Sequence, residues 1–287
     1  MKRRQLWRLL AACLLAAGPA ASRAAERVRV LVPNGPTQVE VIAEGRGPLI
    51  VILPSAARGA DDYDDVAPLL AERGFRVVRP EPRGSGRTTG AHEGISLQDV
   101  AADVAAVIRH ENAGPAVLVG HAGGSFVARM AAVEHPGLVR GVVLAAAGAR
   151  RFPAELNVIV QKVNAPGLPD EERAAHLRKA FFAPGNDVTP WLTGWRPLMR
   201  FGGQGGAPSL SDRERWWGAG DKPVLEIQGR DDPFKPPATH GEYKAEYGDR
   251  VTVVQIAKAS HALFPEQPRA VVEAITRWVA ALPPARR

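Results

Sequence analysis

The stretch 116–129 is the part of the sequence that most constrains the fold. An apolar, β-branched run at 116–119 leads into Gly120-His-Ala-Gly-Gly124, and small and apolar residues typical of a helix follow. A strand, a tight glycine turn and a helix in this order are typical of a nucleophile elbow, Gly-x-Ser-x-Gly. Ala122 stands where that motif has its serine, and a methyl group cannot attack a carbonyl. Any function therefore has to accommodate this substitution.

The first 24 residues have a composition of their own. Basic residues at 2–4 precede the short apolar run 9–17, and small residues follow up to Ala24-Ala25. This order is typical of a secretory signal peptide, and the run is too short for a stable membrane span. We therefore expect a periplasmic or secreted bacterial protein. The general secretory and twin-arginine export routes both stay open.

Charge and cysteine content narrow the function classes further. Removing the five basic residues of segment 1–24 lowers the formal net charge from +7 to +2, which gives no support for nucleic-acid binding. The single cysteine, Cys13, lies in that segment, within a Leu-Ala-Ala-Cys box that leaves lipidation as an alternative. The mature chain has no thiol for a disulfide, a catalytic cysteine or a cysteine metal site. We expect no metal and no cofactor, and the oligomeric state stays open.

Strand-like and helix-like segments alternate along the mature chain. The first two strands, joined by the turn 33–36, suit an antiparallel edge, and Ser96 with Asp99 suits a capping box. Such alternation predicts an α/β fold with a mostly parallel central sheet and helices on both faces. Strands are expected at 28–32, 39–42, 49–53, 75–78, 116–119, 138–147, 224–228 and 251–256, and helices at 61–73, 96–110, 238–247 and 269–281.

Residues 149–222 interrupt this alternation. The segment is too long for an ordinary connection and contains a helical pattern at 171–182, so we expect a helical lid inserted into a core of residues 25–148 and 223–287. The lid carries four of the six tryptophans, which either pack it onto the core or line a substrate cavity beneath it. They are Trp191, Trp195, Trp216 and Trp217.

Three further motifs carry a family resemblance. Residues 80–88 are similar to an Asp-x-Arg-Gly-x-Gly-x-Ser loop, 229–236 to a turn that presents a catalytic acid, and 259–268 to a loop that carries a catalytic histidine. Together with the elbow, they make the chain resemble the α/β-hydrolase superfamily, in its epoxide hydrolase, haloperoxidase and lipase-like branch. The order of elbow, acid and histidine is the one this fold uses. The resemblance covers residues 27–283.

The resemblance assigns roles to individual residues. His261 is the expected base and Asp232 the acid that orients it, with Asp231 as the adjacent alternative. Histidine exchanges a proton near neutral pH, and a carboxylate on its second nitrogen fixes the tautomer. The backbone amides of Gly123 and Ala56 are the expected oxyanion hole.

Two departures from the family pattern bear on the chemistry. Pro54-Ser55 stands where the family commonly has His-Gly, and Ala122 removes the nucleophile. Ser125 lies three residues beyond the elbow and is expected to face elsewhere. The hydroxyl of Ser55 is better placed, although we do not expect it to act as a nucleophile.

We therefore expect an exported enzyme that acts on a small, largely apolar ester or carbonyl substrate. The His261–Asp232 dyad would act as general base on water or on the substrate. One alternative is a lyase, isomerase or cofactor-free oxygenase, whose proton transfer needs no nucleophile. Another is a non-catalytic protein that holds a small ligand. Retention of both dyad residues favours the enzyme, because a binding pocket does not need them.

Overall fold

The computed structural model describes residues 26–196, 198, 200–201 and 213–283. The expected signal peptide lies outside them. In the described residues an eight-stranded sheet has the order β1-β2-β4-β3-β6-β7-β9-β10. Its strands are β1 (Val28–Asn34), β2 (Thr37–Gly45), β3 (Leu49–Leu53), β4 (Arg76–Pro80), β6 (Ala116–His121), β7 (Val139–Ala145), β9 (Val224–Gly229) and β10 (Val251–Ile256).

The sheet is mostly parallel, as the sequence predicts. Strands β4, β3, β6, β7, β9 and β10 pair in parallel, whereas β2 pairs antiparallel with both β1 and β4. The α/β-hydrolase arrangement expected from the sequence is therefore confirmed, including the antiparallel first pair. Parallel strands bring their carboxyl ends to one edge of the sheet, where ligands bind in such folds.

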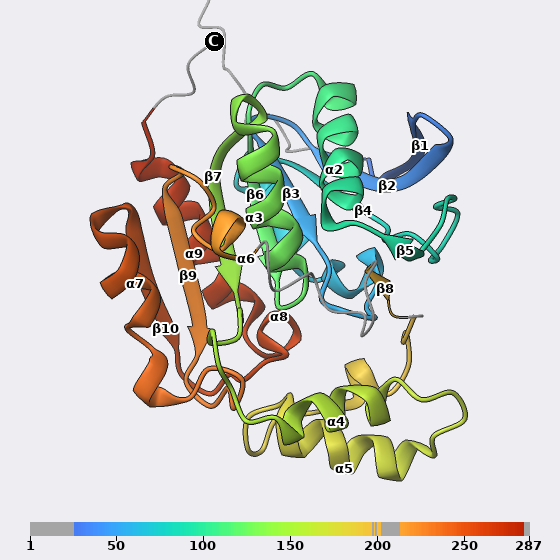
Figure 1. Ribbon diagram of the computed structural model, residues 1–287, viewed down its shortest axis with the longest axis vertical. Coiled ribbons are helices and arrows are strands. Elements are labelled where there is room, and N and C mark those ends of the chain that lie inside the picture. The colour runs from blue at the N-terminus through green and yellow to red at the C-terminus, as the bar shows by residue number, and fades with distance from the viewer. Residues whose placement is uncertain (1–25, 197, 199, 202–212, 284–287) are drawn as a thin grey trace, which may run out of the picture.

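Helices cover both faces because the central strands are apolar on both sides. Leu118 packs into the core beneath α2 and α3, whereas its neighbours Val117 and Val119 pack toward α1 and α9. Figure 1 shows α2 and α3 in front of the sheet. The helices are α1 (Ala67–Glu72), α2 (Leu97–Glu111), α3 (Gly124–Glu134), α4 (Glu155–Val163), α5 (Asp170–Ala180), α6 (Arg213–Trp216), α7 (Glu242–Tyr247), α8 (Leu263–Glu266) and α9 (Pro268–Ala281).

Local signals set the helix boundaries. The capping box at Ser96 and Asp99 forms, with both side chains accepting backbone N–H groups. The single helix predicted over 61–73 is instead a 3-10 turn at Ala60–Tyr63 followed by α1, which starts afresh with Pro68 in its first turn. Proline has no N–H to continue a helix from the preceding turn but suits a helix start.

In the insertion expected between β7 and β9, the described residues form α4 and α5, which pack on each other beyond the carboxyl edge of the sheet (Figure 1). The helix expected at 171–182 is α5, whereas α4 and the short pairing of β5 (Glu93–Ile95) with β8 (Arg200–Phe201) were not predicted. The backbone N–H of Ala262 donates to the carbonyl of Phe181 at 2.7 Å, which fastens the insertion to the core. No helix in the described ranges is long and apolar enough to span a membrane.

Candidate functional site

The turn between β6 and α3 holds Ala122 at its tip. Ala122 has φ +45°, a left-handed conformation that costs an alanine about 1 kcal/mol, and its N–H donates to the Ala145 carbonyl at 2.9 Å. The flanking glycines permit this tight turn, because a Cβ on Gly120 would lie 2.6 Å from the Gly124 carbonyl oxygen. A Cβ on Gly124 would lie 2.3 Å from the carbonyl oxygen of Leu53.

Asp232 and His261 meet at the carboxyl edge of the sheet. They follow β9 and β10, and His261 Nδ1 lies 3.0 Å from Asp232 Oδ2. The second carboxylate oxygen of Asp232 accepts the N–H of Phe234 at 2.8 Å, and the aspartate is 2% exposed. A proton on Nδ1 facing the carboxylate leaves Nε2 as the free basic nitrogen. The neighbouring Asp231 is exposed.

Aromatic rings fix the plane of the His261 imidazole. The ring of Phe234 lies 4.1 Å from it between centroids, at an interplanar angle of 34°, and the ring of Phe181 lies 5.7 Å away. Phe181 comes from the insertion and Phe234 from the loop after β9, so both parts of the chain hold the imidazole. These contacts keep it in apolar surroundings and limit its rotation.

The loop after β3 touches the turn at Ala122. A Cβ added to Gly123 would lie 3.0 Å from the backbone nitrogen of Ala56, which shows how closely the two segments approach. Ser55, which precedes Ala56, donates its backbone N–H to the hydroxyl oxygen of Tyr63 at 3.0 Å. The two amides that the resemblance assigns to an oxyanion hole therefore belong to backbone segments in contact.

His121, which was not predicted as a site residue from the sequence, connects these segments. The Tyr63 hydroxyl donates to its Nδ1 at 2.9 Å, and its Nε2 donates to the His261 carbonyl at 2.8 Å. Burial, followed by the proximity of His261, lowers the pKa of His121 to about 3, so the ring is neutral. In the sequence, only its position between Gly120 and Ala122 could have indicated that His121 belongs to the site.

A cavity of about 360 Å³ lies over these residues. Ser55, Ala56, Ala122, Gly123 and His261 form part of its wall. Its size suits a small organic ligand, and much of the remaining lining is aromatic. The aromatic lining includes Phe126, Phe152, Phe181, Phe234 and the tryptophans Trp191, Trp195, Trp216 and Trp217.

The four tryptophans combine packing with lining of the cavity. Trp191, Trp216 and Trp217 are each 2% exposed and pack in the apolar cores, and all four tryptophans, Trp195 included, also line the cavity. Ser125 is fully buried, accepts a hydrogen bond from Arg129, and is not among the described residues that line the cavity.

Comparison with known proteins adds a family match. The profile of the alpha/beta hydrolase family matches residues 50–274. The chain is 28% identical over 243 residues to a non-heme chloroperoxidase from Streptomyces lividans, covering 73% of this chain and 83% of that protein. It is also 28% identical over 255 residues to a pyrethroid hydrolase from Sphingobium wenxiniae, covering 81% and 88%. The crystal structure of E-2-(acetamidomethylene)succinate hydrolase superposes with a TM-score of 0.74 at 23% identity, covering 89% of this chain and 100% of that one.

Proposed function

The chain belongs to the α/β hydrolase family, and on that premise we propose that it is an exported enzyme acting on a small, largely apolar ester or other carbonyl substrate. The observation that carries the proposal is the 3.0 Å contact between His261 and Asp232, because His261 lines a largely apolar cavity. A buried carboxylate beside an imidazole is a costly arrangement that a passive pocket does not require.

The proposed reaction is hydrolysis by general-base catalysis. His261 Nε2 takes a proton from a water as the water oxygen bonds to the substrate carbonyl carbon, and the carbonyl π electrons move to the oxygen. Asp232 stabilises the imidazolium through Nδ1. The N–H groups of Gly123 and Ala56 donate to the oxyanion. The bond to the leaving oxygen then breaks, and the departing alcohol takes the proton from His261.

Ala122 determines that this mechanism has no covalent intermediate at the turn. With a methyl group at the turn, no acyl-enzyme forms there, and the water attacks directly. Serine-triad enzymes that lose the nucleophile still catalyse the reaction about 10³–10⁴ times faster than it proceeds uncatalysed in water. Slow hydrolysis, or proton transfer to and from a carbon or oxygen acid of the substrate, therefore suits the remaining groups.

The test is the rate on a panel of chromogenic aryl esters for the purified mature protein and its variants. We expect His261→Ala and Asp232→Asn to lower kcat by about 10²-fold or more, since general acid–base catalysis supplies that much. Asp231→Asn is the matched control, because this neighbouring carboxylate is exposed, and its rate should equal that of the wild type. Equal rates for wild type and His261→Ala would overturn the proposal.

A non-catalytic ligand-binding protein is the second candidate, and Ala122 is the observation that favours it. The two candidates differ in what His261→Ala does. In a binding protein the variant changes affinity for an apolar ligand and reveals no lost turnover, whereas in the enzyme turnover falls at nearly unchanged affinity.

Export and the lid role of residues 149–222 belong to the same proposal. Signal cleavage predicts that the protein recovered from a bacterial periplasm begins just after Ala24 or Ala25, which N-terminal sequencing measures. A mature protein that retains Met1 would contradict export by this route.

A further inference from the structure

Three arginines surround one tryptophan at the cavity wall. The Cζ atoms of Arg129 and Arg213 each lie 4.0 Å from the ring centroid of Trp217, and that of Arg150 lies 5.5 Å away. Arg150, Arg213 and Trp217 line the cavity, whereas Arg129 is 1% exposed and packs behind the ring. The guanidinium groups repel one another, so each needs compensation.

Arg150 and Arg129 have their compensation inside the protein. Arg150 donates to Glu214 at 2.6 Å and to Glu246 at 2.7 Å. Arg129 donates to the Ser125 hydroxyl at 3.1 Å, and its cation also lies 5.3 Å from the ring of Tyr243. Both cations are thus engaged with groups of the protein itself.

Arg213 differs from Arg150 because, within the described part of the chain, it bonds to no carboxylate, and it differs from Arg129 because it lines the cavity. The Nε atoms of Arg213 and Arg129 are both buried without a hydrogen-bond partner. The two acids that act on it through space are engaged elsewhere, Glu214 with Arg150 and Glu242 with Lys235 at 3.0 Å. Burial, Arg150 and Arg129 together lower the pKa of Arg213. A guanidinium with unused donors in such surroundings favours a bound anion.

The lining of the cavity also favours an anion. It contains Arg150 and Arg213 but no aspartate or glutamate among the described residues, and the Arg213 guanidinium lies over the ring of Trp217. An anion entering the cavity therefore meets the Arg213 guanidinium, which bonds to no described carboxylate, and no carboxylate among the described lining residues. One guanidinium without a carboxylate partner balances one negative charge. A carboxylate carries that charge, and its two oxygens fit the fork of N–H groups of the guanidinium.

We propose that Arg213 binds a carboxylate group of the substrate, so that the substrate is an apolar ester or other carbonyl compound carrying one carboxylate away from the reacting carbon. The reacting carbonyl rests on the function proposed above, whereas the carboxylate site rests on Arg213 and the cavity alone. Binding of a carboxylate probe, measured without turnover, therefore tests this site separately from catalysis by His261.

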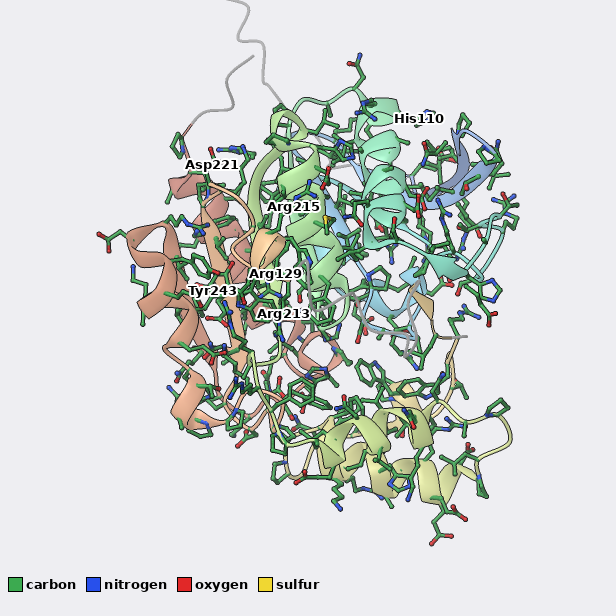
Figure 2. All side chains as sticks on the ribbon, viewed as in Figure 1. His110, Arg129, Arg213, Arg215, Asp221 and Tyr243 are labelled. Carbon is green, nitrogen blue, oxygen red and sulfur yellow. The ribbon has the colours of Figure 1, made fainter. Side chains whose placement is uncertain are left out.

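Arg215 supplies a matched control on the same short helix. In Figure 2, Arg213 lies on the side of α6 nearer α4 and α5, and Arg215 lies on the opposite side. Arg215 is exposed and donates to Glu134 at 2.6 Å, and it does not line the cavity. Replacing either arginine by glutamine removes the same charge from the same helix.

The experiment is isothermal titration calorimetry of the mature protein with 2-naphthoate and with 2-naphthamide, which share shape and differ in charge. We expect the wild type and Arg215→Gln to bind the carboxylate more tightly than the amide. Arg213→Gln should weaken 2-naphthoate by about 10-fold or more and leave 2-naphthamide within about twofold, since a charge-assisted hydrogen bond is lost. Arg213→Lys, which keeps the charge, should retain part of the preference.

Other outcomes would overturn the proposal. One is a wild type that binds the amide as tightly as the carboxylate. Another is Arg213→Gln weakening both probes equally, because that result assigns Arg213 only a packing role against Trp217. If Arg213→Gln fails to fold, two other measurements still test the carboxylate site. They are the preference of the wild type for 2-naphthoate over 2-naphthamide and the same titration of Arg213→Lys. Loss of ester turnover in His261→Ala with intact 2-naphthoate binding would uphold both proposals, and failure of either measurement identifies which proposal is wrong.

Discussion

The imidazole of His121 donates a hydrogen bond through Nε2 to the backbone carbonyl oxygen of His261, 2.8 Å away. Its other nitrogen accepts from Tyr63, whose hydroxyl in turn accepts the Ser55 N–H. One neutral ring therefore joins the loop after β3, the turn at Ala122 and the loop of the candidate base. Protonating Nδ1 would leave it unable to accept from Tyr63, so the connection depends on a neutral His121.

The first prediction is that His121 makes the fold sensitive to acid. Its pKa is about 3 in the folded protein and about 6.5 in the unfolded chain, so between these values the unfolded chain binds the extra proton. The stability from His121 is therefore present above pH 6.5 and falls below it by up to about 1.4 kcal/mol per pH unit. The difference in unfolding free energy between wild type and His121→Gln should shrink from pH 7.5 to pH 5, measured by urea denaturation.

His110→Gln is the control for this series. His110 is exposed on α2, remote from the candidate site (Figure 2), and its substitution should leave the pH dependence of the wild type unchanged. A His121→Gln protein that loses stability toward acid as steeply as the wild type would show that His121 does not carry this effect.

The second prediction concerns the backbone approach behind Ala122. In Gly124→Ala the new methyl group would lie 2.3 Å from the Leu53 carbonyl oxygen and 2.6 Å from that of Pro54, and neither backbone atom can move without shifting β3. We expect a loss of about 2–3 kcal/mol in unfolding free energy. Gly137→Ala meets nothing within 4 Å and should stay within about 0.5 kcal/mol of the wild type. Equal stabilities of the two variants would contradict the close packing.

Much of the fold could be predicted because its signals are local. The apolar runs that became β3 and the first part of β6 are continuous, as strands buried on both faces require, and the Ser96 cap fixed the start of α2. The break near Pro68 and the existence of α4 were missed, because short helices in loops depend on what they pack against.

Only the site residues that follow a strand could be predicted from the sequence. Ala122, Asp232 and His261 each come after a parallel strand, so the topology alone brings them to one edge. Arg213 could not be selected from a sequence with 37 lysines and arginines, because its place in the cavity wall, with no carboxylate partner among the described residues, is a property of the folded chain. The Tyr63–His121 bond likewise joins residues 58 positions apart.

The third prediction is that a fluorophosphonate probe does not label the wild-type protein in the cavity. The probe reacts with an activated hydroxyl, and Ala122 has none. Ser125 is buried against Arg129, and Ser55 is the remaining hydroxyl residue in the cavity wall among the described residues. Mass spectrometry after labelling measures this directly. An adduct on Ser55 or Ser125 would reveal a relocated nucleophile and contradict direct attack by water.

The fourth prediction restores the hydroxyl that the turn lacks. In Ala122→Ser the new Oγ stands on a residue that lines the same cavity as His261, and the left-handed φ of +45° is already imposed by the surrounding backbone. With Asp232 bonded to Nδ1, the free Nε2 of His261 can accept the serine proton. The amides of Gly123 and Ala56 then serve the same oxyanion as in the water reaction.

Ala122→Ser should therefore become labelled by the fluorophosphonate probe and hydrolyse short aromatic esters about 10²-fold faster than the wild type or more. The measurement is the initial rate on a chromogenic ester panel for wild type, Ala122→Ser and the double variant with His261→Ala. The double variant should lose both the labelling and the gain, because an unassisted serine hydroxyl is a weak nucleophile. A folded Ala122→Ser protein with neither property would mean that His261 and the two amides do not converge on the turn, and the ligand-binding candidate would then explain the cavity better.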